Sequence, residues 1–279
     1  MPLIDTHCHI SGTDFDADRD AMIERMIDAG VSAAVVIGCD DDDYPRLRQV
    51  LDAHPGVLFG AWALHPEYEN LPDPSLETIL ERNSQPGMVA VGETGLDFYW
   101  CKEPLDWQRR RFRLHIEAAR VLNKPLIIHA RDAEAQAVEI LRETHAGDMG
   151  FVLHCYSGDL ATAQAAIDAG GLVSFTGSLT FKRNDALRAV CQALPLDKFM
   201  LETDSPFMAP VPLRGKRCEP SYVPYIAQVA ADLHHVSLAE LARITTQTAI
   251  DFFNLPRSIA EVEQELVSNT PALGEPSCD

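Results

Sequence analysis

The sequence has no long apolar run. None of its 279 residues lies in a stretch that approaches the roughly 18 consecutive apolar residues of a transmembrane helix. The N-terminus, MPLIDTHCHI, lacks the basic start and the apolar core of a signal peptide. We therefore expect a cytoplasmic protein with no membrane partner.

Basic residues are scarce. The chain has 23 Lys and Arg against 42 Asp and Glu, which gives a formal net charge of −19. A surface of that sign disfavours broad electrostatic binding to nucleic acid. It remains compatible with an enzyme whose positive charge is carried by bound metal.

Several common motifs are absent. The seven cysteines are odd in number and scattered, with no CxxC pair, which argues against a disulfide framework and against a structural zinc site. No glycine-rich turn follows the first apolar run, and no GxxxxGK[ST] motif occurs. The two usual phosphate-binding loops of nucleotide enzymes are therefore not indicated.

Short apolar runs alternate with amphipathic stretches along most of the chain. The runs are mostly apolar on both faces, as buried parallel strands are, and they recur about every 32 residues. This pattern predicts the α/β class and a (β/α)8 TIM barrel, with an open doubly wound sheet as the alternative. We predict strands at 2–6, 33–37, 57–62, 88–92, 125–129, 151–154, 172–174 and 199–202. We predict helices at 18–29, 104–122, 133–144, 160–169, 185–193, 222–233 and 238–253.

The last residues differ in composition from the rest. Residues 258–279 are acidic at first and then rich in Pro, Gly and Ser. We predict a single barrel domain over residues 1–257, followed by a tail that forms at most a short helix.

Residues that can bind metal follow the apolar runs. His7 and His9 end the first run and point to the same side, because strand side chains alternate; Cys8 between them points the other way, as a small buried hydrophobic residue. In a barrel the carboxyl ends of the strands meet on one face, where histidines and carboxylates are costly unless a cation holds them. The pattern therefore predicts a metal site. The other residues at such strand ends are Glu93, His129, His154 and Asp204.

The chain resembles the TatD family of metal-dependent hydrolases, within the amidohydrolase-like barrels. Six motifs carry the resemblance in order, from about residue 3 to about residue 256. They are DTHCH (5–9), LHP (64–66), GETGLDFYW (92–100), PLIIHAR (125–131), HCYSG (154–158) and LETDSPFMAP (201–210).

The resemblance implies two divalent metal ions. His7, His9 and Asp204 would hold the first ion, His129 and His154 would hold the second, and Glu93 would bridge the two. It also implies Mg²⁺ for a nuclease, whereas sites rich in imidazole bind Mn²⁺ or Zn²⁺ more tightly than Mg²⁺. We expect Mg, Mn or Zn, with affinity following the ligand chemistry.

Two carboxylates are the predicted catalytic residues. Asp204 is the expected general base, because it can touch the first ion and accept a proton from the attacking water. Its alternative role is to cap a helix after Ser205. Glu93 is expected to act as a bridging ligand, since bridging occupies its lone pairs.

Substrate contacts are predicted in three loops. His65 could donate to a phosphate oxygen or be an ordinary loop histidine. Arg131 could bind a phosphate in bidentate fashion or pair with Asp132 or another neighbour. Arg214 and Lys216 belong to the cluster RGKR (214–217), which could grip a nucleic-acid backbone or be a solvated loop.

The GETGLDFYW motif contains residues with open roles. Asp97 could orient a metal ligand or cap its loop. Tyr99 and Trp100 could stack on a base, or they could pack beneath a loop.

We predict a hydrolase that uses a metal-activated water, with a 3′–5′ exonuclease on single-stranded DNA ends as the leading hypothesis. The alternative is hydrolysis of ester or amide bonds, as by a D-aminoacyl-tRNA deacylase, because the metal ligands would be shared and specificity lies in the loops. A non-enzymatic metal-stabilised scaffold is disfavoured, since the full set of ligand residues is kept.

Overall fold

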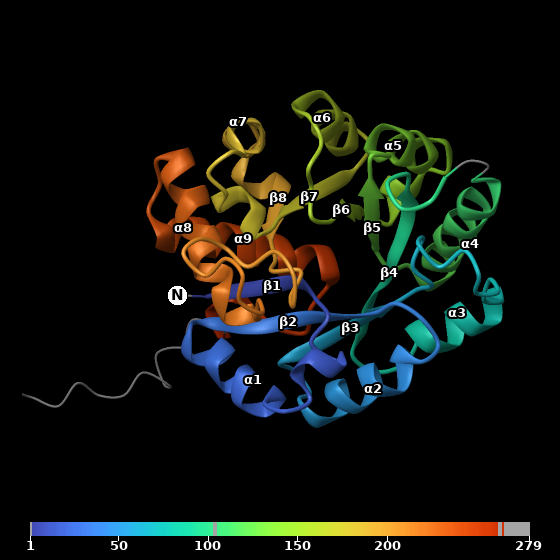
Figure 1. Ribbon diagram of the computed structural model, residues 1–279, viewed down its shortest axis with the longest axis horizontal. Helices are drawn as coiled ribbons and strands as arrows, with labels where there is room; N and C mark the ends of the chain where they lie inside the picture. The colour runs from blue at the N-terminus through green and yellow to red at the C-terminus, as the bar shows by residue number, and fades with distance from the viewer. Residues whose placement is uncertain (1, 103–104, 262–263, 265–279) are drawn as a thin grey trace, which may run out of the picture.

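A single parallel sheet of eight strands forms the centre of the protein. The computed structural model describes residues 2–102, 105–261 and 264. The strands pair in sequence order, and every neighbouring pair is parallel (Figure 1). They are β1 (Leu3–Cys8), β2 (Val31–Gly38), β3 (Leu58–Trp62), β4 (Met88–Asp97), β5 (Leu126–Arg131), β6 (Phe151–Leu153), β7 (Gly171–Phe175) and β8 (Phe199–Leu201).

Hydrogen bonds between β1 and the end of β8 close the sheet. The Thr6 hydroxyl donates to the carbonyl of Leu201 (3.1 Å), and the buried carboxylate of Asp5 accepts from the backbone N–H and the hydroxyl of Thr203 (2.9 and 2.5 Å). Cys8 and Ser205 form a parallel bridge. The predicted (β/α)8 barrel is therefore confirmed.

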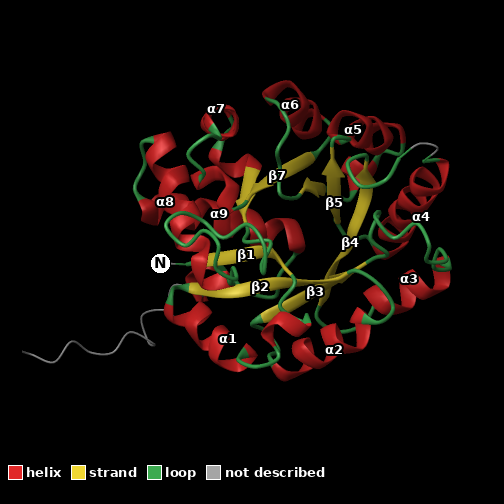
Figure 2. Ribbon diagram, in the orientation of Figure 1, coloured by secondary structure: helices red, strands yellow, loops and turns green. Residues whose placement is uncertain are grey.

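Helices surround the barrel (Figure 2). The helices are α1 (Arg19–Asp28), α2 (Asp43–Ala53), α3 (Leu76–Asn83), α4 (Asp106–Leu122), α5 (Glu134–Glu143), α6 (Leu160–Asp168), α7 (Asp185–Ala193), α8 (Val223–His234) and α9 (Leu238–Phe253). The sequence prediction missed α2 and α3. In the structure α2 buries Leu47, Val50 and Leu51 on its inner face, and α3 buries Ile79 and Asn83.

The two faces of each strand bury different sets of apolar residues. In β2, Ala34 and Val36 pack with the helix residues Met22 and Leu47, whereas Val35 and Ile37 belong to a separate inner cluster that fills the barrel. This two-sided burial is the reason the strands read as continuous apolar runs in the sequence.

The membrane, cysteine and tail predictions can be compared with the described residues. Among the residues that the structure describes, no helix has the length and hydropathy needed to cross a membrane. Every cysteine within those residues is free, and Cys8 is fully buried with its thiol 3.4 Å from the carbonyl of Val35. Of the predicted tail, 258–279, only residues 258–261 and 264 lie within the described residues.

Candidate metal centre

The six predicted ligands come together at the carboxyl ends of the strands. His7 lies in β1 and His9 just beyond it, Glu93 lies in β4, and His129 lies in β5. His154 directly follows β6, and Asp204 lies in the loop after β8. Residues almost 200 positions apart in the chain thus share one site, because a barrel directs all its strand ends to one face.

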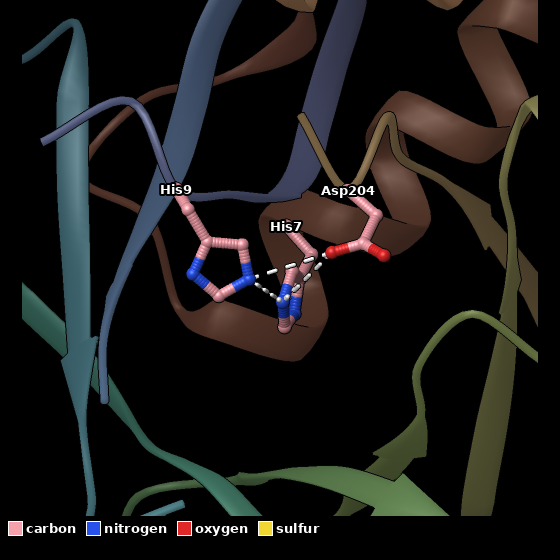
Figure 3. Close-up of side chains that lie close together, drawn as sticks. All are labelled: His7, His9 and Asp204. Atoms are coloured by element: carbon pink, nitrogen blue, oxygen red, sulfur yellow. Dashed lines mark hydrogen bonds and ion pairs between the residues drawn. The ribbon is translucent and has the colours of Figure 1, made fainter. Parts of the chain in front are cut away.

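Four of these side chains form the first half of the site. Figure 3 shows His7, His9 and Asp204 turned toward one another. The His7 Nε2 and His9 Nε2 atoms are 3.2 Å apart, and they lie 3.8 and 3.4 Å from the Asp204 Oδ1 atom. The Glu93 Oε2 atom is 3.3 Å from His7 Nε2 and 3.7 Å from His9 Nε2.

The other carboxylate oxygen of Glu93 faces the second half of the site. Its Oε1 atom lies 2.8 Å from His129 Nδ1, 2.6 Å from His154 Nε2 and 3.3 Å from His65 Nε2. Glu93 thus places one oxygen against each group of imidazoles, which is the arrangement of a bridging carboxylate.

The spacing of the first group suits a divalent ion. Donor atoms bound tetrahedrally at about 2.1 Å from a zinc-like ion lie about 3.4 Å from one another. The His7 and His9 Nε2 atoms lie 3.2 Å from each other and 3.3–3.8 Å from the nearest oxygens of Glu93 and Asp204. Nitrogen and carboxylate donors of this kind suit Mn or Zn at least as well as Mg.

The hydrogen bonds of His129 and His154 indicate that the second half of the site also suits a cation. The Asp97 carboxylate accepts from His129 Nε2 (2.8 Å), so in the neutral ring the lone pair of Nδ1 faces Glu93. In the same way Glu202 accepts from His154 Nδ1 (3.3 Å), so the lone pair of Nε2 faces Glu93. A lone pair directed at a carboxylate oxygen is repulsive unless a proton or a metal cation lies between them.

Two histidines of the site stack on each other, which limits how many of the rings can be protonated at the same time. The rings of His7 and His154 are nearly parallel, with centroids 3.9 Å apart and an interplanar angle of 7°. Two protonated imidazoles would repel each other in this position, whereas two neutral rings can stack while each directs one nitrogen at a cation.

Glu202 is a site residue that the sequence motifs alone did not single out. This residue is 1% exposed and follows β8. Besides His154, it accepts from the backbone N–H of Cys155 (2.6 Å) and from the hydroxyl of Ser174 (2.5 Å). A carboxylate that fixes the tautomer of a ligating histidine is a common partner in metal sites. Its position at the end of an apolar run was the only signal in the sequence.

Asp97 combines both of its predicted alternatives. One carboxylate oxygen orients His129, and the other accepts from the backbone N–H of Trp100 (2.7 Å), which caps the loop after β4. Gly95 permits this approach of β4 to β5: its φ is +145°, and a Cβ atom there would lie 2.0 Å from the carbonyl oxygen of His129.

His65 is a hydrogen-bond donor at the edge of the site. Its Nδ1 accepts from the backbone N–H of Glu67 (3.2 Å), so in the neutral ring the proton is on Nε2, the atom that faces Glu93. Arg111 donates to the carbonyl of His65 (3.0 Å), and His115 accepts from the N–H of Leu64 (3.3 Å), which fixes this loop. The geometry therefore favours a hydrogen-bond donor to Glu93 over a metal ligand.

The charges within the site are tightly coupled. Burial would raise the pKa of Glu93, but the surrounding imidazoles, His154 first among them, hold it well below its usual range. Burial and the neighbouring His154 lower the pKa of His7, which keeps its ring neutral. Burial opposes charge on His9, His129 and His154, yet the acidic groups beside them raise their pKa values. A metal cation would displace protons at these rings.

The predicted cationic contacts lie outside the ligand group. Arg131 has its guanidinium carbon 4.1 Å from the centroid of the Tyr99 ring, and it makes no ion pair with Asp132 or with any other described residue. Arg214 stacks on Phe181 at 3.8 Å, and Lys216 is exposed. None of the three makes a hydrogen bond or ion pair with the six candidate ligands.

One member of the RGKR cluster has a structural role. Arg217 donates to both carboxylate oxygens of Asp18 (2.7 and 2.8 Å) and so ties the loop after β8 to the start of α1. Only Arg214 and Lys216 of this cluster therefore remain candidates for binding an anion.

Comparison with known proteins agrees with this geometry. The sequence model described as TatD related DNase matches residues 4–254. "Uncharacterized metal-dependent hydrolase YcfH" of Escherichia coli K12 is 37% identical over 261 residues, which cover 92% of this chain and 98% of that protein. YabD of Bacillus subtilis, described in the same words, is 36% identical over 254 residues, which cover 91% and 99%.

Two further matches extend the comparison to a named nuclease and to a crystal structure. "3'-5' ssDNA/RNA exonuclease TatD" of Pantoea vagans is 29% identical over 259 residues, which cover 91% of this chain and all of that protein. The crystal structure of YJJV, a TatD homologue from Escherichia coli K12, superposes with a TM-score of 0.84 at 29% identity over 91% of this chain and 98% of that one. The chain therefore belongs to the TatD family of metal-dependent hydrolases, as its six motifs predict.

Proposed function

We propose that this protein is a deoxyribonuclease that removes nucleotides from the 3′ ends of single-stranded DNA, and that it uses two divalent ions. His7, His9 and Asp204 would hold one ion, and His129 and His154 the other. The position of Glu93 carries the proposal, because its two oxygens face two separate groups of imidazoles.

The two ions, when bound, would polarise the phosphodiester and make a water molecule more acidic. Asp204 is suited to take the proton of the attacking water. Its Oδ1 faces the two histidines, while its Oδ2 makes no hydrogen bond to the described part of the chain. A carboxylate with one oxygen committed and the other free can serve both as ligand and as general base.

The remaining predicted residues would hold the substrate. The N–H of His65 Nε2 faces the Glu93 Oε1 atom at 3.3 Å, and it would donate to a phosphate oxygen once Glu93 holds the ions. Arg131 has no carboxylate partner among the described residues, so its guanidinium remains available for a phosphate. Arg214 and Lys216 would attract the DNA strand further from the site, in a protein whose net charge is −19.

DNA as the substrate rests on three supports. The family model is described as a DNase, and a relative that covers almost the whole chain is named as an exonuclease on single-stranded DNA and RNA. In addition, paired divalent ions suit displacement at phosphorus.

The test is a nuclease assay with matched histidine variants. Purified protein with Mg²⁺ or Mn²⁺ should shorten a 5′-labelled single strand stepwise from its 3′ end. His129→Ala should lose this activity, whereas His54→Ala, at the end of α2 and outside the ligand group, should keep it. Elemental analysis after Mn²⁺ loading should find about two ions per chain. Cleavage that persists in His129→Ala would show that the activity comes from another protein.

A further inference from the structure

Two exposed aromatic side chains follow β4. Tyr99 is 46% exposed and Trp100 is 61% exposed, and their rings meet at 90° with centroids 4.7 Å apart. The hypothesis that they pack beneath a loop is therefore wrong for this structure. An indole with most of its surface in water gives up a large hydrophobic gain.

This aromatic pair is held in a fixed place. The Asp97 carboxylate binds His129 on one side and the N–H of Trp100 on the other, so only one side chain separates the pair from a candidate metal ligand. The Lys102 ammonium donates to the carbonyls of Phe98 and Tyr99 (3.0 and 2.7 Å), which closes the turn. The rings are consequently preorganised next to the site.

A positive charge accompanies the rings. The guanidinium carbon of Arg131 is 4.1 Å from the centroid of Tyr99 and 5.5 Å from that of Trp100. Together the three side chains combine an exposed π-face with a cation that has no carboxylate partner among the described residues. A nucleotide carries the matching groups, a flat base and a phosphate.

Another exposed aromatic residue lies beside the opposite half of the site. Phe207, in the loop after β8, is 61% exposed, and its ring centroid is 6.4 Å from that of His9. Among the described Phe, Tyr and Trp residues, Trp100 and Phe207 are the most exposed. They lie in loops that contact opposite halves of the ligand group, Trp100 through Asp97 and Phe207 beside His9.

We propose that Trp100, supported by Tyr99 and Arg131, stacks on an unpaired base of the substrate next to the scissile phosphate. This inference rests on the proposed nuclease function and specifies its substrate. A base inside a duplex is covered on both faces by its neighbours, so a stacking platform of this kind selects single strands.

The first experiment crosses a protein variant with a substrate variant. Wild type and Trp100→Ala are each given oligothymidylate and the same oligomer with a 3′-terminal residue that lacks its base. On the base-bearing strand Trp100→Ala should raise KM by about 5- to 150-fold, which corresponds to the stacking free energy of one base. On the strand without the terminal base the change in KM should be less than about twofold, since the interaction is already absent.

Control variants separate the loss of stacking from a general disturbance of the structure. Trp100→Phe keeps an aromatic face and should restore most of the lost affinity. Val121→Ala, at a residue of similar exposure (62%) at the end of α4, should leave both KM values unchanged. An equal rise in KM for Trp100→Ala on both strands, or no rise on either, overturns the proposal.

A binding measurement covers the case in which the nuclease function itself fails. Failure of the wild type to cut any strand with Mg²⁺ or Mn²⁺ would overturn that function alone. Oligothymidylate should still quench tryptophan fluorescence of the wild type, because Trp100 is exposed, whereas Trp62 is buried and Trp107 is partly buried. The quenching should disappear in Trp100→Ala. Absence of quenching in the wild type overturns the stacking proposal.

Discussion

Replacing Glu202 by glutamine should weaken metal binding at His154 without unfolding the protein. Glu202 is buried, and it accepts from the Nδ1 of His154, the N–H of Cys155 and the hydroxyl of Ser174. Glutamine has the same shape. Its carbonyl oxygen can keep the first two bonds, and its amide can donate to Ser174, whose hydroxyl rotates to accept.

The expected loss of metal affinity follows from the loss of the negative charge beside His154. With the charge removed, His154 becomes a weaker ligand, and changes of this type cost about 10- to 100-fold in metal affinity, or about 1.4–2.7 kcal/mol. Alanine at the same position would instead leave three buried donors without partners, at about 1–3 kcal/mol each. A loss of about 3–9 kcal/mol is comparable to the whole stability of a typical domain.

The assay is a calorimetric titration of metal-free protein with Mn²⁺, together with thermal unfolding in EDTA. Glu202→Gln should melt within a few degrees of the wild type in EDTA but bind one of two ions more weakly. Glu202→Ala should melt much earlier. Unchanged affinity for both ions in Glu202→Gln would refute the view that Glu202 tunes His154 as a ligand.

Three further predictions concern the ligand group and its supports. Removal of metal with EDTA should lower the melting temperature, because metal at about 100 times its Kd stabilises the folded state by about 2.7 kcal/mol; identical melting with and without Mn²⁺ would contradict a metal site. His65→Gln should lower kcat/KM while the metal content measured by elemental analysis stays unchanged, because the N–H of His65 Nε2 is a donor; a loss of metal would make His65 a ligand. Burial lowers the pKa of His115 to about 4, so its contribution to stability is complete above the unfolded pKa of 6.5 and falls as the pH drops toward 4. Wild type should therefore lose about 3 kcal/mol more unfolding free energy than His115→Gln between pH 7 and 4, as measured by urea unfolding; parallel losses would contradict this assignment.

Local patterns in the sequence determined the strands of this protein. A buried parallel strand must be apolar on both faces, so each of the eight runs is visible without knowledge of its partners. The same logic found seven of the helices but missed α2 and α3. Their buried faces are only two or three residues wide, as are those of α1, α6 and α7, so the width of the apolar face does not explain why these two helices were missed.

The sequence also identified the residues that gather at the site. His7, His9, His129 and His154 each stand near or just beyond the carboxyl end of a strand, and once the barrel is predicted these ends must converge. Glu93 follows its predicted strand, 88–92, but in the structure β4 continues past it to Asp97. The prediction therefore depended on topology alone and needed no knowledge of side-chain contacts.

Only the tertiary structure decided how these groups are paired. The contact between His154 and Glu202 joins residues 48 positions apart, and that between His129 and Asp97 joins residues 32 positions apart. The tautomer of each ring, and thus its capacity to bind metal or to donate, depends on such partners. The placement of Arg131 on Tyr99, instead of beside Asp132, was likewise settled by packing. Hydrogen bonds and stacking act over a few ångströms in space, and separation along the chain does not reveal which groups come that close.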